Sequence, residues 1–108
     1  MLRRGHLYWA HVPDDKRRPV LVVSPEERNT RALDAIVVPL TTVVREGPWH
    51  VRLRRGEGGA PQASVLKCER VTTLRTARID DRPLGPALGP TRMAEVERGI
   101  LRAIGVPV

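Results

Sequence analysis

The amino-acid sequence predicts a small, mainly β domain: a curled antiparallel barrel capped by a C-terminal helix. Short runs of strand-forming residues alternate with Pro-, Gly- and Asp-rich turns along most of the chain. Only the last stretch repeats apolar residues at the three- and four-residue spacing of a helix. The length of 108 residues predicts one domain, residues 1–108.

The first two predicted strands occupy residues 6–12 and 19–23. The first is rich in strand formers after Gly5. The second lacks polar alternation, which indicates that both its faces are covered. Pro19 has no N–H for a central ladder, so we expect it to open this strand, with Arg18 at the lip of the sheet. Residues 13–15 are expected to turn the chain between the two strands.

Three more strands are predicted over residues 35–42, 49–54 and 63–72. Pro39 favours an edge position or a bulge in the third strand. The fourth alternates, so Val51 and Leu53 should face inward and His50, Arg52 and Arg54 outward. The connections differ in composition: residues 25–33 are polar and predict a loop that can include a helical turn, and residues 55–62 predict a mobile hairpin loop.

The C-terminal stretch predicts one amphipathic helix after an irregular segment, residues 75–88. Pro90 suits the first helical position, and Gly105 ends the helix before Pro107. Its apolar stripe should face the core. The stripe consists of Met93, Val96, Ile100, Leu101 and Ile104.

The charge balance favours a polyanion or an acidic protein as partner. Lys and Arg total 19 against 12 Asp and Glu, for a net charge of +7. Aromatic residues are 3% of the chain, so aliphatic side chains must build the core. A domain this small buries a limited share of its surface, and its strands are apolar on both faces. We therefore expect a homodimer.

Several classes of protein are disfavoured by composition. The single cysteine, Cys68, excludes an internal disulfide and fits a reducing, cytoplasmic compartment. One Cys and three His make no convincing zinc site, so neither a metal nor a cofactor is expected. No apolar run follows the basic N-terminus or approaches membrane-spanning length, so no membrane partner is expected.

Candidate site residues gather at the predicted strand ends. Lys16, Arg17 and Arg18 crowd the start of the second strand, where a guanidinium could grip a phosphate. The alternative is a solvated basic loop. Lys67 and Glu69 share a predicted strand face, as an acid–base pair or as a surface ion pair worth less than about 1 kcal/mol. Tyr8 or Trp9 could stack on bases, although core packing is the better interpretation for Trp9.

Five ordered blocks of the sequence resemble the MazF/PemK (Kid) family of type II toxin–antitoxin systems. The resemblance runs through nearly the whole chain. The blocks are Arg4–Gly5 with Tyr8–Ala10, then Lys16–Ser24, Val38–Thr42, His50–Leu53 and Lys67–Leu74. The first loop, residues 12–17, is shorter than in many relatives and lacks their loop His and Glu.

The resemblance implies an SH3-like barrel related to the CcdB toxin, and a homodimer. It implies ribosome-independent, metal-independent cleavage of single-stranded RNA at a short sequence. It also implies an acidic antitoxin that inserts into the RNA groove, with operator DNA bound only by the toxin–antitoxin complex. By resemblance, Arg18 and Thr41 take the positions of the family's active-site arginine and threonine. Lys67 and Glu69 take those of its basic residue and carboxylate.

Metal-free RNA cleavage uses the ribose 2′-hydroxyl as the nucleophile and leaves a 2′,3′-cyclic phosphate and a 5′-hydroxyl. It needs a base, positive charge on the phosphorane and a proton donor. We expect Glu69 as the base, Arg18 as the clamp and Thr41 as the phosphate-orienting hydroxyl. Lys67 would supply charge or the proton, and His50 is a second candidate acid. The predicted RNA-binding residues are Lys16, Arg17, Thr42, His50, Arg52 and Arg54.

Two other functions stay open at this stage. One is a CcdB-like toxin that binds a protein target without chemistry, and the combination of Arg18, Thr41 and Glu69 argues against it. The other is an inactive relative that binds only its antitoxin or RNA. The short first loop keeps this second alternative open.

Overall fold

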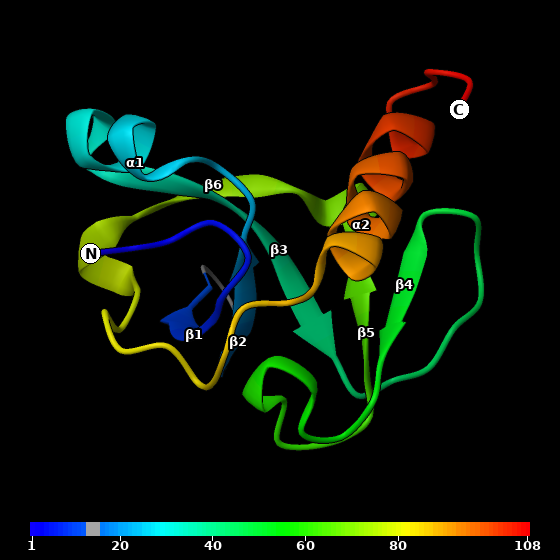
Figure 1. Ribbon diagram of the computed structural model, residues 1–108, viewed down its shortest axis with the longest axis horizontal. Helices are drawn as coiled ribbons and strands as arrows, with labels where there is room; N and C mark the ends of the chain where they lie inside the picture. The colour runs from blue at the N-terminus through cyan, green and yellow to red at the C-terminus, as the bar shows by residue number, and fades with distance from the viewer. Residues whose placement is uncertain (13–15) are drawn as a thin grey trace.

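A computed structural model describes residues 1–12 and 16–108, so the turn predicted at residues 13–15 lies outside the described residues. It confirms a mainly antiparallel β fold with a C-terminal helix (Figure 1). The strands are β1 (Leu7–His11), β2 (Arg17–Val22), β3 (Asp34–Thr41), β4 (His50–Leu53), β5 (Ser64–Lys67) and β6 (Thr72–Arg75). The helices are α1 (Glu26–Ala32) and α2 (Pro90–Ala103), with 3-10 turns at Glu57–Gly59, Cys68–Arg70 and Thr76–Arg78.

The strands form one strongly bent antiparallel sheet in the order β1-β2-β3-β5-β4, with β6 also paired to β3. An antiparallel bridge between Ala10 and Ile79 joins the far edge of β1 to the segment after β6, so β1, β2, β3 and β6 close into a small barrel. Strand β3 belongs to both halves of the sheet: it pairs with β2 as far as Pro39 and with β5 from Leu40 onward. The change of partner at Pro39 positions the end of β3 beside β5.

The sequence predicted that Pro19 opens the second strand, but in the structure it lies inside β2. The backbone N–H of Val22 donates to the carbonyl of His6. In an antiparallel ladder hydrogen-bonded and non-hydrogen-bonded residue pairs alternate, so counting from this bond shows which pairs of β1 and β2 are hydrogen-bonded. By this alternation the Trp9–Pro19 pair lies between those bonds, and the nitrogen of Pro19 points away from β1. The described β2–β3 register starts only at the next residue, so no ladder bond is lost.

Two apolar clusters lie on the two sides of this sheet. The barrel interior contains Leu2, Tyr8, Ala10, Val20, Val22, Ala35, Val37, Leu74 and Ile79. The second cluster packs between the other side of the sheet and α2, and includes Leu7, Leu21, Leu40, Leu66, Met93 and Val96. Val20, Leu21 and Val22 are all 0% exposed within the single chain. The argument that a partner chain must cover the two apolar faces of β2 is therefore wrong.

Helix α1 occupies a segment that the sequence predicted as a loop. Its polar composition concealed a buried hydrogen-bond network. Asn29, 3% exposed, donates from Nδ2 to the carbonyls of Leu2 and Ser24. Glu26 and Glu27 lie in the first turn, where the helix dipole favours negative charge. Leu33 ends the helix in the left-handed region, with φ 57°.

The predicted strand over residues 63–72 is divided into β5, a 3-10 turn and β6. Before the turn at Cys68–Arg70, the chain forms β5, which pairs with β4 and with the end of β3. After the turn it forms β6, which pairs with the start of β3, so six strands are present where five were predicted. Cys68 is fully buried in this turn. The two-residue alternation used to place Lys67 and Glu69 on one strand face therefore ends at Lys67.

The loop predicted as mobile, residues 55–62, is anchored to α2. Glu57 accepts from Arg92 Nε and Nη2 at 2.7 and 3.0 Å, and both side chains are 25% exposed. Gly59 has φ 87°, and its nitrogen lies close to Gly85, so a side chain here would meet the backbone of the irregular segment before α2.

Helix α2 confirms the predicted C-terminal helix and packs over β4 and the Cys68–Arg70 turn (Figure 1). Met93 and Val96 are buried as predicted, whereas Ile104 lies beyond the helix end and is 65% exposed. No helix in the described parts of the chain is long and apolar enough to cross a membrane.

Candidate active site

A cavity of about 320 Å³ lies where β3, β4 and β5 present their ends on the sheet side opposite α2. We call it the cationic pocket. Its lining residues are Thr41, Val43, Arg45, His50, Val65, Lys67 and Arg70. Three of the seven carry a full positive charge and none is acidic, so the pocket favours an anion such as phosphate.

The sheet register assembles this pocket from separate strands. Thr41 pairs with Val65, and Lys67 pairs with His50, which places all four on neighbouring strands. Leu66 and Val51, one residue away, point into the second apolar cluster. Because side chains alternate along a strand, Thr41, Lys67 and His50 share the opposite face.

His50 joins the pocket to Glu69. Its Nδ1 donates to the carbonyl of Arg45 at 2.8 Å, and its Nε2 lies 3.0 Å from Glu69 Oε2. A carbonyl only accepts, so Nδ1 carries a hydrogen. The His50 side chain is 10% exposed, which corrects the prediction of a solvent-facing ring.

Glu69 is held in its ionised form. Partial burial raises the pKa of the Glu69 carboxyl, but the hydrogen bonds from His50 and from its own backbone, with the charges of His50 and Lys67, outweigh burial, so the pKa is lower than usual. The carboxylate is 31% exposed and therefore reachable from solvent. It is a fixed, ionised proton acceptor at neutral pH.

Thr41 has two roles at the end of β3. Its Oγ1 accepts the backbone N–H of Val43 at 3.2 Å, as expected of a threonine that ends a strand. It also lines the cationic pocket. An accepting hydroxyl keeps its own hydrogen, so Thr41 can still donate to an anion in the pocket.

The basic triplet at the start of β2 is divided between two sides of the sheet. Arg18 is half-buried opposite Ala10 and shares a strand face with Val20; among the described residues it is not one that lines the cationic pocket. Arg17 forms an ion pair with Asp80, and its guanidinium lies 5.1 Å from the centre of the Trp9 ring. Lys16 is exposed.

The other predicted RNA contacts lie outside the cationic pocket. Arg52 is 62% exposed and ion-paired with Glu46, and Arg54 is exposed on the same strand face. Thr42 lines a smaller cavity, of about 110 Å³, together with Trp9. Tyr8 is 0% exposed and accepts the Arg3 N–H at 2.9 Å, so the suggestion that it stacks on bases is wrong.

Arg45 and Arg70 were not predicted as site residues. Arg45 lies between the third and fourth predicted strands, where no element was predicted. Arg70 lies in a predicted strand whose alternation would place it on the side of buried Cys68. The 3-10 turn instead brings Arg70 to the pocket wall. No sequence signal distinguishes these two arginines from the other basic residues.

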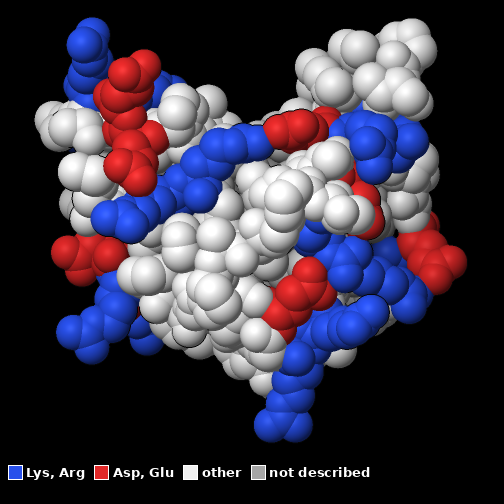
Figure 2. Space-filling view, in the orientation of Figure 1, with Lys and Arg blue, Asp and Glu red and all other residues white. Residues whose placement is uncertain are grey.

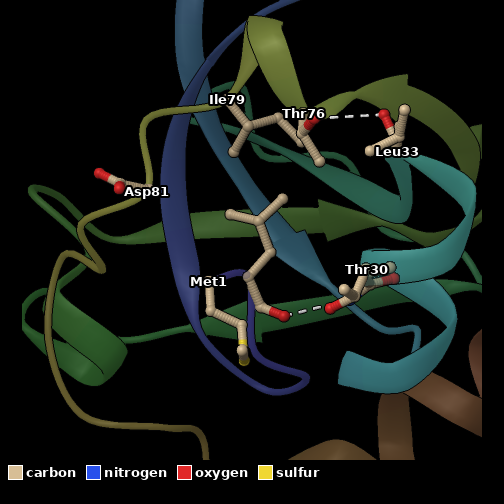
Figure 3. Close-up of a pocket in the computed structure, with 8 residues that line it drawn as sticks. Met1, Thr30, Leu33, Thr76, Ile79 and Asp81 are labelled. Atoms are coloured by element: carbon tan, nitrogen blue, oxygen red, sulfur yellow. Dashed lines mark hydrogen bonds between the residues drawn. The ribbon is translucent and has the colours of Figure 1, made fainter.

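Two further cavities lie at the two ends of the barrel. One, of about 410 Å³, adjoins the cationic pocket, and we call it the barrel mouth. Its lining residues are Val12, Val20, Val37, Pro39, Glu69, Arg70, Thr72 and Leu74. The other, of about 320 Å³, lies at the opposite end beside α1, where Thr76 donates to the Leu33 carbonyl (Figure 3). Asp81 is its one charged side chain among the described lining residues, so this cavity does not suit a phosphate.

Charge elsewhere on the surface is mixed. In the view of Figure 2, Lys and Arg are interleaved with Asp and Glu, and the surface is hollowed between the α1 end and the end of α2. Several arginines are neutralised by ion pairs, including Arg4 with Glu97 and Arg92 with Glu57 and Glu95. In the described part of the chain, no three His, Cys, Asp or Glu side chains gather into a metal-binding group.

Comparisons with known proteins agree on one family. The family described as PemK-like, MazF-like toxin of type II toxin–antitoxin system matches residues 3–104. The chain is 31% identical over 106 residues to the probable endoribonuclease MazF5 of Mycobacterium tuberculosis, covering 97% of this chain and 91% of that protein. It is 28% identical over 113 residues to the endoribonuclease MazF2 of Mycobacterium bovis, covering 96% and 97%.

Solved structures give the same result. A mycobacterial endoribonuclease in complex with its cognate antitoxin superimposes with a TM-score of 0.84 at 26% identity, over 100% of this chain and 99% of that one. A MazE–MazF structure from Deinococcus radiodurans gives a TM-score of 0.80 at 25% identity, over 98% and 97%.

Proposed function

The chain belongs to the family of PemK-like, MazF-like toxins of type II toxin–antitoxin systems and is an endoribonuclease, and we propose that it cleaves single-stranded RNA at the cationic pocket without a metal ion. The observation that supports this most is the position of one ionised carboxylate, Glu69, beside a pocket lined by three cations. A base next to a phosphate-sized cationic site is the arrangement that attack by a 2′-hydroxyl requires.

The cationic pocket would hold the scissile phosphate. Arg45, Lys67 and Arg70 supply positive charge to the phosphorane oxygens, and the Thr41 hydroxyl donates a hydrogen bond that orients the phosphate. Arg18 keeps its predicted role as a clamp, because it shares a β2 face with Val20, whose partner Pro39 lies two residues before Thr41 on β3. A guanidinium stays protonated, so Arg18 contributes charge rather than a proton.

Glu69 would accept the proton of the 2′-hydroxyl as its oxygen attacks the phosphorus. His50 is a positioning residue, because it fixes the carboxylate from one side while the Arg45 carbonyl fixes the ring. Lys67, opposite His50 on β5, would protonate the leaving 5′-oxygen. The bond from phosphorus to the 5′-oxygen then breaks, which leaves a 2′,3′-cyclic phosphate and a 5′-hydroxyl.

The test is incubation of a labelled RNA pool with the protein in EDTA, followed by chemical mapping of the product ends. We expect cleavage in EDTA, with 2′,3′-cyclic phosphate and 5′-hydroxyl ends. Cleavage that requires magnesium, or that leaves 5′-phosphates, would contradict the mechanism. No cleavage of any RNA under either condition would favour the inactive alternative.

The proposed partners follow from charge and from the relatives. Two solved relatives are complexes with an antitoxin, and the net charge of +7 suits an acidic antitoxin on this chain too. Operator DNA would be bound only by the toxin–antitoxin complex. Since the substrate is cellular RNA, we place the activity in the cytoplasm.

A homodimer remains a proposal, now supported by a different surface. An apolar groove of about 420 Å³ runs along α2, lined by residues that include Ile36, Val71, Ile100 and Leu101. Three exposed apolar side chains continue past the helix end: Ile104, Val106 and Val108. The Arg4–Glu97 ion pair lines the same groove, and the apolar surface beside this pair favours contact with a second protein surface.

A further inference from the structure

We infer that the barrel mouth binds the nucleobase on the 5′ side of the scissile phosphate and thereby contributes to the choice of cleavage site. The inference rests on the proposed function of the cationic pocket and goes beyond it, because it assigns a second, apolar cavity. The barrel mouth is about 410 Å³, within the range of small-molecule sites, which run from about 300 to 1,000 Å³.

The first argument is adjacency. Arg70 lines both the cationic pocket and the barrel mouth. Glu69 lines the barrel mouth and is hydrogen-bonded to His50, which lines the cationic pocket. In RNA the ribose joins a base to its own 3′-phosphate, and it carries the 2′-hydroxyl between them. With the phosphate in the cationic pocket and the 2′-hydroxyl at Glu69, the base of the same nucleotide falls at the barrel mouth.

The second argument is the chemistry of the lining. The floor is aliphatic and buried, since Val20, Val37, Pro39 and Leu74 expose little of their surface to solvent. The floor itself has almost no surface left to cover, so the gain comes from burying the apolar faces of the base and the partly exposed Val12 side chain that also lines the cavity. Backbone ladders and core packing hold the floor rigid, so it can exclude a base of the wrong shape.

The third argument is the polar rim. The exposed groups at the barrel mouth are the Thr72 hydroxyl, the Arg70 guanidinium and the Glu69 carboxylate. A few polar groups around an apolar floor are what orient a small ligand and discriminate between relatives of similar shape. Thr72 takes no part in the proposed chemistry, and it is therefore the residue through which specificity can be tested alone.

Strand β6 offers a matched pair of variants. Thr72 and Thr73 are adjacent, exposed and of the same type, but only Thr72 lines the barrel mouth among the described residues. Thr72→Leu fills the rim and removes a hydroxyl, whereas Thr73→Leu makes the same change on the other face of the strand. Both side chains are exposed, so neither change disturbs the core.

The first experiment uses a random RNA pool and sequences the 3′ ends of the products. We expect Thr72→Leu to change the preference for the base just before the cut by about tenfold, the usual effect of one lost contact, and Thr73→Leu to leave it unchanged. Equal preferences in both variants and the unmodified protein would overturn the inference while the proposed function stands.

The second experiment does not depend on catalysis. Methyl NMR spectra would be recorded with inorganic phosphate, with nucleoside 3′-monophosphates and with nucleoside 5′-monophosphates. We expect phosphate and 5′-nucleotides to shift the methyls of Val43 and Val65, and only 3′-nucleotides to shift those of Val12 and Leu74 as well. If 3′-nucleotides leave Val12 and Leu74 unshifted, the inference is wrong. If 3′-nucleotides shift the methyl signals of Val12 and Leu74 although the protein cleaves no RNA, the proposed function fails and the base site stands.

Discussion

The hydrogen bond between His50 and Glu69 is the contact on which the proposed chemistry depends at the scale of single residues. It lies between Nε2 and Oε2 at 3.0 Å, and the ring is fixed on its other side by the Arg45 carbonyl. A glutamate on a turn would otherwise sample several rotamers, and fixing it reduces the entropy that catalysis must overcome.

Glu69→Gln should remove the base with little change of shape. We expect cleavage to slow by roughly 10²–10⁴-fold, the usual size of a general-base effect, with RNA affinity almost unchanged. Single-turnover cleavage and a binding titration measure the two quantities. Glu27→Gln, exposed in the first turn of α1, is the matched control and should leave both intact. If Glu69→Gln keeps full activity, the base lies elsewhere, and Asp14 and Asp15, outside the described residues, are the next candidates.

The lowered pKa of Glu69 predicts a pH-dependent contribution to stability. Partial burial opposes ionisation, but the hydrogen bond from His50 prevails, so the folded pKa lies below the usual value. A depressed carboxyl pKa stabilises the fold above the unfolded value, about 4.3, and this stabilisation is lost as the pH falls through the folded pKa. Urea unfolding of the unmodified protein and of Glu69→Gln should differ most at neutral pH. A difference that stays constant into acid would contradict the assignment.

At the scale of elements, α2 supports the site from behind. A Cβ on Gly99 would lie 2.9 Å from Cys68 Sγ and 3.1 Å from the Trp49 carbonyl. These residues precede Glu69 and His50 in the chain, and the N–H of Cys68 donates to the Trp49 carbonyl at 3.3 Å. The close approach of α2 at Gly99 therefore fixes the backbone that carries the proposed base and its positioning residue.

Gly99→Ala should weaken this packing despite its better helix propensity. Overpacking costs about 1–3 kcal/mol, against about 1 kcal/mol gained from replacing glycine, so we expect a net loss of stability. Thiol labelling provides a local probe, because burial raises the pKa of Cys68 to about 12 and keeps the thiol unreactive in the folded protein. Labelling should accelerate in Gly99→Ala but not in Gly89→Ala, where a Cβ meets no atom within 4 Å. Unchanged labelling would show that α2 adjusts without cost.

At the scale of the whole molecule, the net charge of +7 governs RNA binding. Affinity for single-stranded RNA should fall steeply with salt, with a log–log slope of about −0.7 per phosphate contacted. Titrations at several salt concentrations measure this slope. Arg45→Ala should reduce its magnitude, whereas Arg31→Ala, on the last turn of α1, should not. A slope near zero would argue against RNA as the ligand.

The proposed homodimer makes a separate prediction at this scale. Ile104 is 65% exposed at the end of α2, so Ile104→Asp should leave the 12.1 kDa chain folded but shift it toward the monomer in light scattering. Leu33→Asp, at a site 71% exposed near α1, should leave the oligomeric state unchanged. A monomer in the unmodified protein at micromolar concentration would contradict the proposal.

Local signals were sufficient to predict most elements of the fold. The alternation over residues 49–54 predicted β4, and the apolar spacing after Pro90 predicted α2, because backbone hydrogen bonding imposes these periods on any buried face. Local propensity could not predict α1, where buried Asn29 is polar because it hydrogen-bonds to the backbone of Leu2, far away in the sequence. It also missed the turn at Cys68–Arg70, where packing against α2 overrides strand propensity.

The sequence by itself determined the residue types that we propose for the site: Arg18, Thr41, Lys67 and Glu69 were predicted from strand ends and from family resemblance. Only the tertiary structure decided which groups meet. It turned His50 inward onto Glu69, brought Arg45 and Arg70 to the pocket wall, and placed Arg17 on the other side of the sheet. The physical reason is that a strand's period fixes which way a side chain points, whereas its neighbours depend on the register and bends of strands far apart in the chain.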